Sequence, residues 1–350
     1  MKWPGIWSDA VSSVASERSN PLPMLMGLAA RGGLRTEKVY FFREARGNFF
    51  CGPAKLYGFP VARSAAGWRC FMSMLNATEY TTEHTTMHID LTGRTALVSA
   101  STAGIGFAIA KGLASAGAHT IINGRSEASV VESLDALREA VPNADVRGIA
   151  GDVSTAEGVA KLTHAVPSVD ILVNNAGIYG PEPFFDVTDE TWERFFQTNV
   201  MSGVRLARHY LRGMLERNRG RIVFISSESA LNIPADMIHY GMTKTAQLSI
   251  ARGLAKLAAG THVTVNAVLP GPTLSEGVKS MLEETAAKEG KRIDDVAVEF
   301  VRTHRASSIL QRPATVEEVA NLVVYVCSPQ ASATTGAALR VDGGVVDSIV

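Results

Sequence analysis

The sequence predicts an α/β fold in residues 87–350, with one doubly wound parallel sheet of about seven strands and helices on both faces. Three observations predict it. Short apolar runs rich in β-branched residues alternate with longer amphipathic stretches. Most of these runs are too apolar to be half exposed, which is typical of parallel strands covered on both faces. A glycine-rich turn also joins the first run to the first helical stretch.

The seven expected strands follow one another at βαβ spacing, and right-handed crossovers place the ligand crevice of such a sheet at the carboxyl ends of its strands. They are RTALVSA (94–100), HTIIN (119–123), VRGIA (146–150), DILVNN (170–175), RIVFIS (221–226), HVTVNAV (262–268) and AALRV (337–341). Amphipathic stretches at 188–217 and 238–259 predict long helices, and 274–311 predicts one or two more with a charged outer face.

Residues 1–86 show no sustained apolar period, because Gly, Pro and Arg interrupt each candidate run. We expect an irregular extension that is disordered or lies outside the native domain, which would then begin at Met87. A signal peptide is disfavoured, since the segment before the apolar stretch 21–30 is long and contains Asp9 and Glu17.

The amino-acid composition limits the kinds of binding partner that we expect for this protein. Lys plus Arg and Asp plus Glu each number 34, without a long basic run, so we expect neither nucleic acid nor a membrane surface as partner. Three scattered cysteines (Cys51, Cys70, Cys327) are too few for a disulfide framework or a zinc site. These features favour a cytoplasmic protein that binds a small molecule and no metal.

The first strand leads into SASTAGIG, in which Gly104 and Gly106 open a helix. Glycine lets the backbone approach a pyrophosphate, whose charge is stabilised by the free N–H groups at the start of the helix. No carboxylate follows the second strand, where one would bind the adenosine ribose of NAD. Gly124 leaves room there, and Arg125 with Ser126 could hold a 2′-phosphate, so NADP is preferred over NAD.

Tyr240 and Lys244 are four residues apart in a predicted helix and therefore lie on one face. A nearby ammonium favours the phenolate form of a tyrosine, which suits acid/base chemistry. Ser227 ends the strand that precedes them. His239 is offset by one residue and points elsewhere, so we assign it no catalytic role. Polar loops GDV (151–153), NNAG (174–177), TNV (198–200) and PGPT (270–273) follow at the same sheet edge.

In this combination of motifs, residues 87–350 resemble the short-chain dehydrogenase/reductase family, in the branch similar to 3-oxoacyl-ACP reductases, with a Rossmann-type fold. The resemblance implies that Tyr240 is the acid/base, that Lys244 lowers its pKa and holds the nicotinamide ribose, that Ser227 binds the substrate oxygen and that Asn199 holds a water. The residues expected to bind the cofactor are Ser99, Ser101, Thr102, Gly104, Ile105, Gly106, Arg125, Asp152, Val153, Asn175, Ala176, Gly177, Tyr240, Lys244, Pro270, Gly271 and Thr273.

One departure from the family pattern is that Ser99-Ala100 replaces the usual Thr-Gly at the start of the glycine-rich turn. If Ala100 takes a positive φ, we expect a cost of about 1 kcal/mol. The resemblance also implies that VDGG (341–344) forms the closing turn and that the protein is a homodimer or homotetramer.

The resulting hypothesis is an NAD(P)(H)-dependent oxidoreductase that transfers a hydride between nicotinamide and a carbonyl or secondary alcohol. We expect 274–311 to form a substrate lid over a mainly apolar pocket, although several of the aliphatic pocket residues could instead pack the core or a subunit interface. The candidate pocket residues are Ile178, Tyr179, Leu231, Ile233, Pro234, Met237, Met281, Leu282, Val296, Val298, Phe300 and Val301. A catalytically silent dinucleotide sensor or scaffold and a sugar-nucleotide epimerase or dehydratase stay as alternatives.

Overall fold

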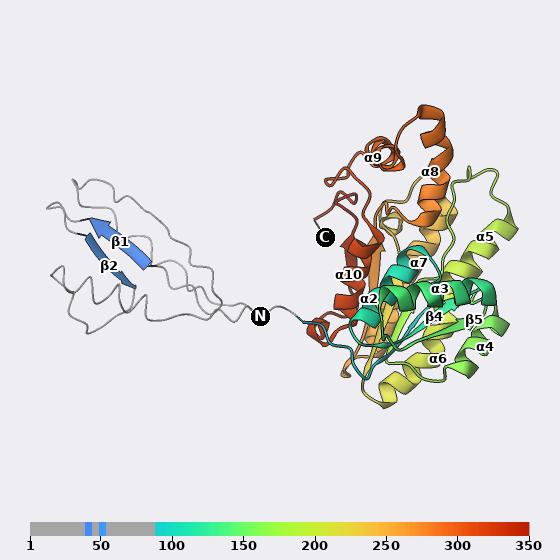
Figure 1. Cartoon of the computed structure of the whole chain (residues 1–350), viewed down its shortest axis with the longest axis horizontal. Helices are drawn as coiled ribbons and strands as arrows, with labels where there is room; N and C mark the ends of the chain where they lie inside the picture. Colours follow the sequence, from blue (N-terminus) through green and yellow to red (C-terminus); the bar gives the residue numbers. More distant parts are fainter. Residues whose placement is uncertain (1–38, 44–48, 54–87, 350) are drawn as a thin grey trace, which may run out of the picture. The chain divides into compact units, whose positions relative to one another are not determined.

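The computed structural model describes residues 39–43, 49–53 and 88–349, and the chain divides into two units, Met1–Thr86 and Met87–Val350 (Figure 1). In the first unit, β1 (Val39–Arg43) and β2 (Phe49–Pro53) form an antiparallel pair. Their valine and aromatic residues favour strands, but the runs are too short to predict from the sequence. The expected disorder of this extension otherwise falls outside the described residues.

The second unit contains a seven-stranded sheet in the order β5-β4-β3-β6-β7-β8-β9, and each neighbouring pair is parallel. The strands are β3 (Thr95–Val98), β4 (His119–Gly124), β5 (Val146–Ala150), β6 (Ile171–Asn174), β7 (Gly220–Ile225), β8 (Val263–Pro270) and β9 (Ala338–Val341). The chain order reverses between β3 and β6, and open α/β sheets bind their ligands at such a switch point. All seven expected strands are confirmed.

Helices cover both faces of the sheet, because successive strand residues point to opposite sides. Leu97 packs in a cluster with α4 (Ala156–Ala165), α6 (Ser202–Glu216) and α7 (Ile238–Leu257). Val98 packs in the other cluster, with α2 (Gly104–Ser115), α3 (Glu127–Ala140) and α10 (Val316–Cys327). The predicted doubly wound Rossmann-type fold is therefore confirmed.

Two predicted helical stretches are subdivided in the structure. The stretch 188–217 contains α5 (Asp189–Phe196), the π-helical turn η1 (Gln197–Met201) and α6. The stretch 274–311 contains α8 (Glu276–Glu289) and α9 (Ile293–His304), which lie beyond the sheet layers (Figure 1). Short 3-10 turns form η2 (Glu228–Ala230) and η3 (Pro329–Ala331). Among the described residues, no helix has the length and apolar character needed to span a bilayer.

Candidate functional site

The turn between β3 and α2 has the geometry of an anion site. Ala103 precedes α2 and supplies no side-chain cap, so the first N–H groups of the helix have no partner from that side chain. A Cβ on Gly106 would come within 2.5 Å of Ala100 O and of Asn175 Nδ2. Gly106 therefore lets the helix approach the turn closely. Gly104 adopts a φ of 57°, and Ile105 packs partly buried against the core.

Ala100 adopts a φ of 48° and is exposed. This is the left-handed region, which is sterically unfavourable for a residue with a Cβ but which glycine adopts readily. The strain expected from the sequence at this position is thus present in the structure.

Side chains that follow the two neighbouring strands β3 and β6 hold the turn in place. Ser99 Oγ accepts hydrogen bonds from the backbone N–H groups of Asn175 (3.0 Å) and Ala176 (3.1 Å), and Asn175 Nδ2 donates to Ala100 O at 2.8 Å. Ser101 is fully buried, and its Oγ donates to Val98 O at 2.7 Å. These expected cofactor residues therefore also set the shape of the switch point.

Asn123 is a functional-site residue that sequence reasoning missed. It is fully buried at the end of β4, where its Oδ1 accepts from Ala100 N–H (3.2 Å) and its Nδ2 donates to Ile149 O (3.1 Å) and Gly151 O (3.0 Å). Asn123 thus holds together the ends of β3, β4 and β5. An amide that directly follows two isoleucines of a buried strand was the available signal, because a buried amide needs several partners.

The end of β4 presents the residues expected to choose between the two nicotinamide cofactors. Arg125 is exposed, and within the described part of the chain it makes no hydrogen bond or ion pair. Ser126 caps α3 by accepting from Ser129 N–H at 3.2 Å. The room beside Gly124 is taken up by the protein itself, since a Cβ there would lie 2.5 Å from Thr102 Cγ2.

Other residues that we expect to bind the cofactor follow the carboxyl ends of β5 and β8, and they differ in burial and in hydrogen bonding. Asp152 Oδ1 accepts from Ser154 N–H at 2.9 Å, whereas Val153 is 5% exposed and packs in the core. Pro270 ends β8, and a Cβ on Gly271 would lie 2.6 Å from Asp342 O, so two backbones approach closely here. The hydroxyl of Thr273 donates to Gly271 O at 2.9 Å.

Ser227, Tyr240 and Lys244 come together between β7 and α7. The Lys244 Nζ atom lies 5.6 Å from the centre of the Tyr240 ring, and the Ser227 side chain is a hydrogen-bond partner of the Tyr240 hydroxyl. Two further bonds fix the loop against the helix: Ser226 Oγ donates to Lys244 O (2.9 Å) and Thr245 Oγ1 donates to Ala230 O (2.8 Å). The helical spacing noticed in the sequence therefore places both side chains next to Ser227.

Burial has the largest effect on the pKa values of Tyr240 and Lys244. It raises the pKa of Tyr240 to about 12, against the opposing hydrogen bond from Ser227. It also lowers the pKa of the Lys244 ammonium to about 8. The Nζ of Lys244 donates to Ile225 O at 2.9 Å. The pKa of Tyr240 is thus above its ordinary value, because its loss of hydration outweighs the lowering by Ser227 and Arg305. Lys244 is not among the groups that lower this pKa, so the effect implied by the family resemblance is not found.

Asn199 lies in the π-helical turn η1, a distortion that is frequent at functional sites. Its Oδ1 accepts from Ile178 N–H at 2.7 Å, and its Nδ2 donates to Ile178 O and Thr243 Oγ1, each at 3.0 Å. A Cβ on Gly177 would lie 3.4 Å from Lys244 Nζ and 3.5 Å from Asn199 Oδ1. Asn199 and Lys244 therefore both border the space that the glycine leaves.

His239 packs against α5, as its offset from Tyr240 in the helix predicts. It is 1% exposed, and its ring packs edge-on against Phe195 at a centroid distance of 4.4 Å. Neither ring nitrogen has a hydrogen-bond partner in the described part of the chain. The residues described also contain no cluster of three or more His, Cys, Asp or Glu side chains arranged to hold a metal ion.

The aliphatic residues of 274–311 mainly pack against one another. Leu282 and Val296 are buried in a small cluster between α8 and α9, with Phe300 partly buried beside them, and Val301 is 1% exposed. Met281 is 49% exposed. The alternative that these residues pack a core is thus the better description for most of them, since two amphipathic helices bury their apolar faces together.

Half-exposed apolar side chains instead line the loops near Ser227 and Tyr240. Tyr179, Leu231 and Ile233 are about half exposed. The loop after β6 also carries Phe184, which is about half exposed, and Phe185, which is 95% exposed; sequence reasoning missed both. Ser275 at the start of α8 is a hydrogen-bond partner of the Tyr179 hydroxyl. Of these side chains, Tyr179 acts on the pKa of Tyr240 and Ile233 lies beside Gly241 of α7, so both lie near Tyr240.

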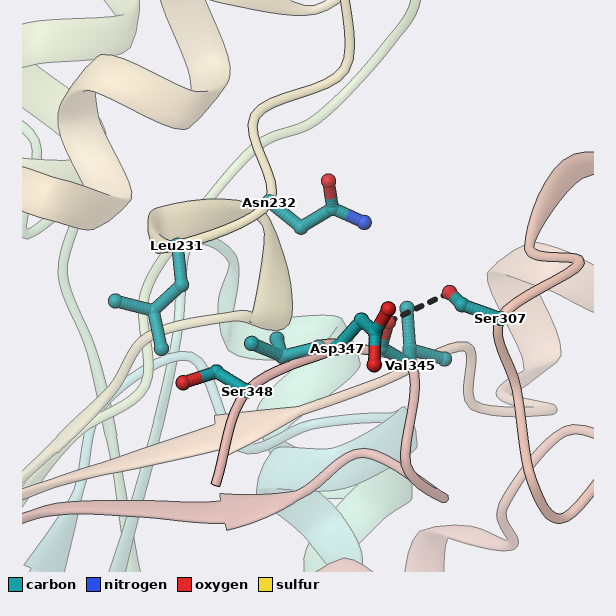
Figure 2. Close-up of a pocket in the computed structure, with 7 residues that line it drawn as sticks. Leu231, Asn232, Ser307, Val345, Asp347 and Ser348 are labelled. Carbon is teal, nitrogen blue, oxygen red and sulfur yellow. Dashed lines mark hydrogen bonds between the residues drawn. The ribbon is translucent and has the colours of Figure 1, made fainter. Parts of the chain in front are cut away.

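A hollow of about 530 Å³ lies beside the Ser227 loop, and Figure 2 shows its lining. Leu231 and Asn232 approach it from that loop, Ser307 from the segment after α9, and Val345 to Ser348 from the carboxyl-terminal tail. Ser307 Oγ donates to Val345 O at 2.6 Å, the contact dashed in Figure 2. Three segments distant in the sequence thus meet next to the site.

Comparisons with known proteins agree with this geometry. A family model described as enoyl-(acyl carrier protein) reductase matches residues 99–346. The uncharacterized oxidoreductase YvaG of Bacillus subtilis is 49% identical over 263 residues, which are 75% of this chain and 100% of YvaG. The 3-oxoacyl-[acyl-carrier-protein] reductase FabG of Aquifex aeolicus is 34% identical over 266 residues, which are 74% of this chain and 100% of that protein.

Among solved structures, L-sorbose reductase from Gluconobacter frateurii, complexed with NADPH and L-sorbose, matches with a TM-score of 0.70 and 31% identity over 75% of this chain and 100% of that one. The fold, the switch-point turn and the extent of these matches lead to one conclusion. The chain belongs to the short-chain dehydrogenase/reductase family of oxidoreductases that act on CH–OH and C=O groups, in the branch similar to 3-oxoacyl-ACP reductases.

Proposed function

We propose that this protein is an NADP(H)-preferring oxidoreductase that interconverts a carbonyl compound and a secondary alcohol, with Tyr240 as the acid/base. The observation that carries the proposal is the convergence of Ser227, Tyr240 and Lys244, with the Lys244 Nζ atom 5.6 Å from the Tyr240 ring. The L-sorbose reductase and FabG relatives support it, because both are reductases by name.

The residues fit a nicotinamide dinucleotide. The N-terminus of α2 has no side-chain cap, and Gly106 leaves a close approach that a Cβ would fill. Ser99, Ser101 and Asn175, three of the residues expected to bind the cofactor, make hydrogen bonds at that turn. Bound there, the dinucleotide would supply or accept the hydride. Arg125 favours NADP because it is exposed and its guanidinium is able to pair with a 2′-phosphate.

In the reducing direction Tyr240 donates a proton to the substrate oxygen, and Ser227 stabilises the negative charge that develops on it. Lys244 holds the ribose and supports proton resupply, with Asn199 bordering the same space. Since burial raises the pKa of Tyr240 to about 12, the phenol is protonated near neutral pH and suited to this donation. Oxidation of the alcohol requires the phenolate and should therefore become faster as the pH rises.

The test is nicotinamide absorbance with a panel of ketones, β-keto thioesters, aldehydes and ketoses such as L-sorbose. We expect turnover with NADPH, and a loss of at least about 100-fold in kcat for Tyr240→Phe with cofactor binding preserved. Binding without turnover on any substrate would favour the sensor or scaffold alternative instead. A nucleotide-sugar product would favour the epimerase or dehydratase alternative.

Arg125→Gln tests the cofactor preference. It should raise KM for NADPH by about tenfold and leave KM for NADH nearly unchanged, because only the former carries the 2′-phosphate. Arg138→Gln is the matched control, since Arg138 is an exposed arginine in α3, the helix that follows Arg125. Equal effects of both variants on the two cofactors would refute the role of Arg125.

Three further features complete the proposal. The catalytic domain consists of residues 87–350. Within it, the segment 274–311 acts as a substrate lid through its attachment to the Ser227 loop. The protein assembles as a homodimer or homotetramer. The exposed Arg208 and Arg212 on α6 and the half-exposed apolar loops offer surface for association. Light scattering coupled to gel filtration measures the number of subunits, and a monomeric mass would exclude both the homodimer and the homotetramer.

A further inference from the structure

Glu228 is a buried carboxylate directly after Ser227. It is 3% exposed, and its Oε1 accepts a hydrogen bond from Arg305 Nε at 2.9 Å. Its Oε2 has no hydrogen-bond partner among the residues described. A carboxylate buried away from water destabilises the fold unless a cation pairs with it. The contact with Arg305 therefore holds the loop that carries Glu228 and the segment that carries Arg305 together.

Arg305 directly follows α9, at the end of the proposed lid, and its own segment is firmly held. Its N–H donates to Val301 O (2.8 Å), and Nη1 donates to His304 O (2.8 Å). Two residues further on, Ser307 Oγ donates to Val345 O, and Leu310 N–H donates to Gly343 O at 2.9 Å. The segment that follows Arg305 is therefore attached to the carboxyl-terminal tail, through the Ser307–Val345 contact shown in Figure 2.

Hydrogen bonds also connect the Glu228 backbone to the rest of the loop that carries Ser227. Ser227 Oγ accepts from Ser229 N–H at 3.1 Å, and Glu228 O accepts from the N–H groups of Leu231 and Asn232, each at 2.9 Å. A displacement of Glu228 would therefore move the Ser227 hydroxyl together with the loop that borders the hollow.

We propose that the Glu228–Arg305 ion pair positions Ser227: it fastens the loop that carries Ser227 to the end of the lid, so that closure over the substrate and orientation of the substrate oxygen occur together. The inference rests on the proposed function, in which Ser227 and Tyr240 act on that oxygen. Glu228 and Arg305 are positioning residues in this scheme, and neither needs to touch the substrate.

The pair also acts on Tyr240 through its charges, in opposite directions. Glu228 raises the pKa of Tyr240 and Arg305 lowers it, while the other groups that act on this phenol are Ser227 and Tyr179, with Lys244 beside the ring. Glu228 itself faces Arg305 and Asp342, and burial raises its pKa. Oxidation of the alcohol needs the Tyr240 phenolate, so removing either charge should displace the pH profile of oxidation.

The experiment uses the full chain, NADP(H) and the carbonyl–alcohol pair on which the wild type is active in the panel above. Glu228→Gln and Arg305→Gln should each raise KM for the carbonyl substrate and lower kcat/KM about 10- to 100-fold, with NADPH affinity unchanged. The oxidation profile should move to lower pH in Glu228→Gln and to higher pH in Arg305→Gln. Arg305→Lys, which keeps the charge, should keep the wild-type profile.

Arg305→Gln leaves a buried carboxylate unpaired and is able to destabilise the fold, so the double variant Glu228→Gln/Arg305→Gln is measured as well. Its loss should be no larger than that of the worse single variant, because the two residues act as one unit. Arg312→Gln is the matched control, since Arg312 pairs with Glu318 (2.8 Å) on the same stretch and touches no residue of the Ser227 loop.

The outcomes separate the two proposals. Wild-type turnover in Tyr240→Phe would overturn the proposed function. If Tyr240→Phe is inactive while the variants of the pair match Arg312→Gln in KM, kcat/KM and pH profile, the positioning role alone is overturned. Lower thermal stability with an unmoved pH profile would likewise overturn it, because the pair would then only hold the fold.

Discussion

Ala100 shows how one methyl group can carry strain at a binding turn. Its φ of 48° is unfavourable for any residue with a Cβ, whereas the family resemblance implies glycine here. Ala100→Gly should stabilise the fold by about 0.5–1 kcal/mol, since relief of the strain exceeds the added freedom of the unfolded chain. Urea unfolding measures this change.

The matched control is Ala136→Gly, at an exposed position inside α3. Glycine in an exposed helix interior should destabilise by about 1 kcal/mol, so the two substitutions have opposite signs. A destabilising Ala100→Gly would show that the positive φ costs nothing here.

Lys244 makes the stability depend on pH. Burial lowers its pKa to about 8 from the ordinary value of 10.5, so between these values the unfolded chain binds more protons than the folded one. The free energy of unfolding should therefore rise with pH in this window, by about 2 kcal/mol between pH 7 and pH 9.5. Below pH 8 both states are protonated and the full cost of the buried ammonium is present.

Denaturant titrations of the wild type and Lys244→Met over this range isolate that effect, because the variant lacks the titrating group. The difference in unfolding free energy between them should shrink as the pH rises. A constant difference would mean that Lys244 keeps an ordinary pKa in the folded protein.

At the scale of elements, the contact between α7 and the Ser227 loop depends on Gly241. A Cβ at this position would lie 2.5 Å from Ile233 Cγ2 and 3.1 Å from Ser229 O. Gly241→Ala should cost about 1–3 kcal/mol and lower kcat/KM about tenfold or more, because the helix that carries Tyr240 would be pushed away from Ser227. Thermal unfolding and steady-state rates check both effects.

Gly253 of the same helix is the matched control, since no atom lies within 4 Å of the position a Cβ would take there. Gly253→Ala should stabilise by about 1 kcal/mol and leave the rates unchanged, because alanine favours the helix. If both variants behaved alike, close packing at Gly241 would not be what positions Tyr240.

At the scale of the whole molecule, the seven-stranded sheet and both core clusters consist of residues from 91 onward. A chain that starts at Met87 should therefore fold with the same thermal midpoint and keep kcat/KM within about twofold, because it retains the entire described core. Calorimetry and NADPH turnover of the short and full chains measure this. A large loss of either property would assign a role to the first 86 residues.

Local patterns were sufficient for the sheet, its strand positions and the Tyr240–Lys244 pair, because apolar alternation and helical spacing are properties of neighbouring residues. The same patterns located the glycine-rich turn, whereas the possible strain at Ala100 followed from the family resemblance, and the structure has the positive φ on which it depended. They did not reveal that α5 and α6 are joined by a π-helical turn, in which Asn199 contacts Ile178 and Thr243 from distant parts of the chain.

The sequence by itself thus determined the fold class, the order of the elements and which residue types reach the switch point. Only the tertiary structure decided that Asn123 ties three strand ends together, that the aliphatic residues of α8 and α9 mostly pack against one another, and that Glu228 pairs with Arg305 across 77 positions of the chain. Such contacts join residues with no common local period, so only the packing of the folded chain brings them together.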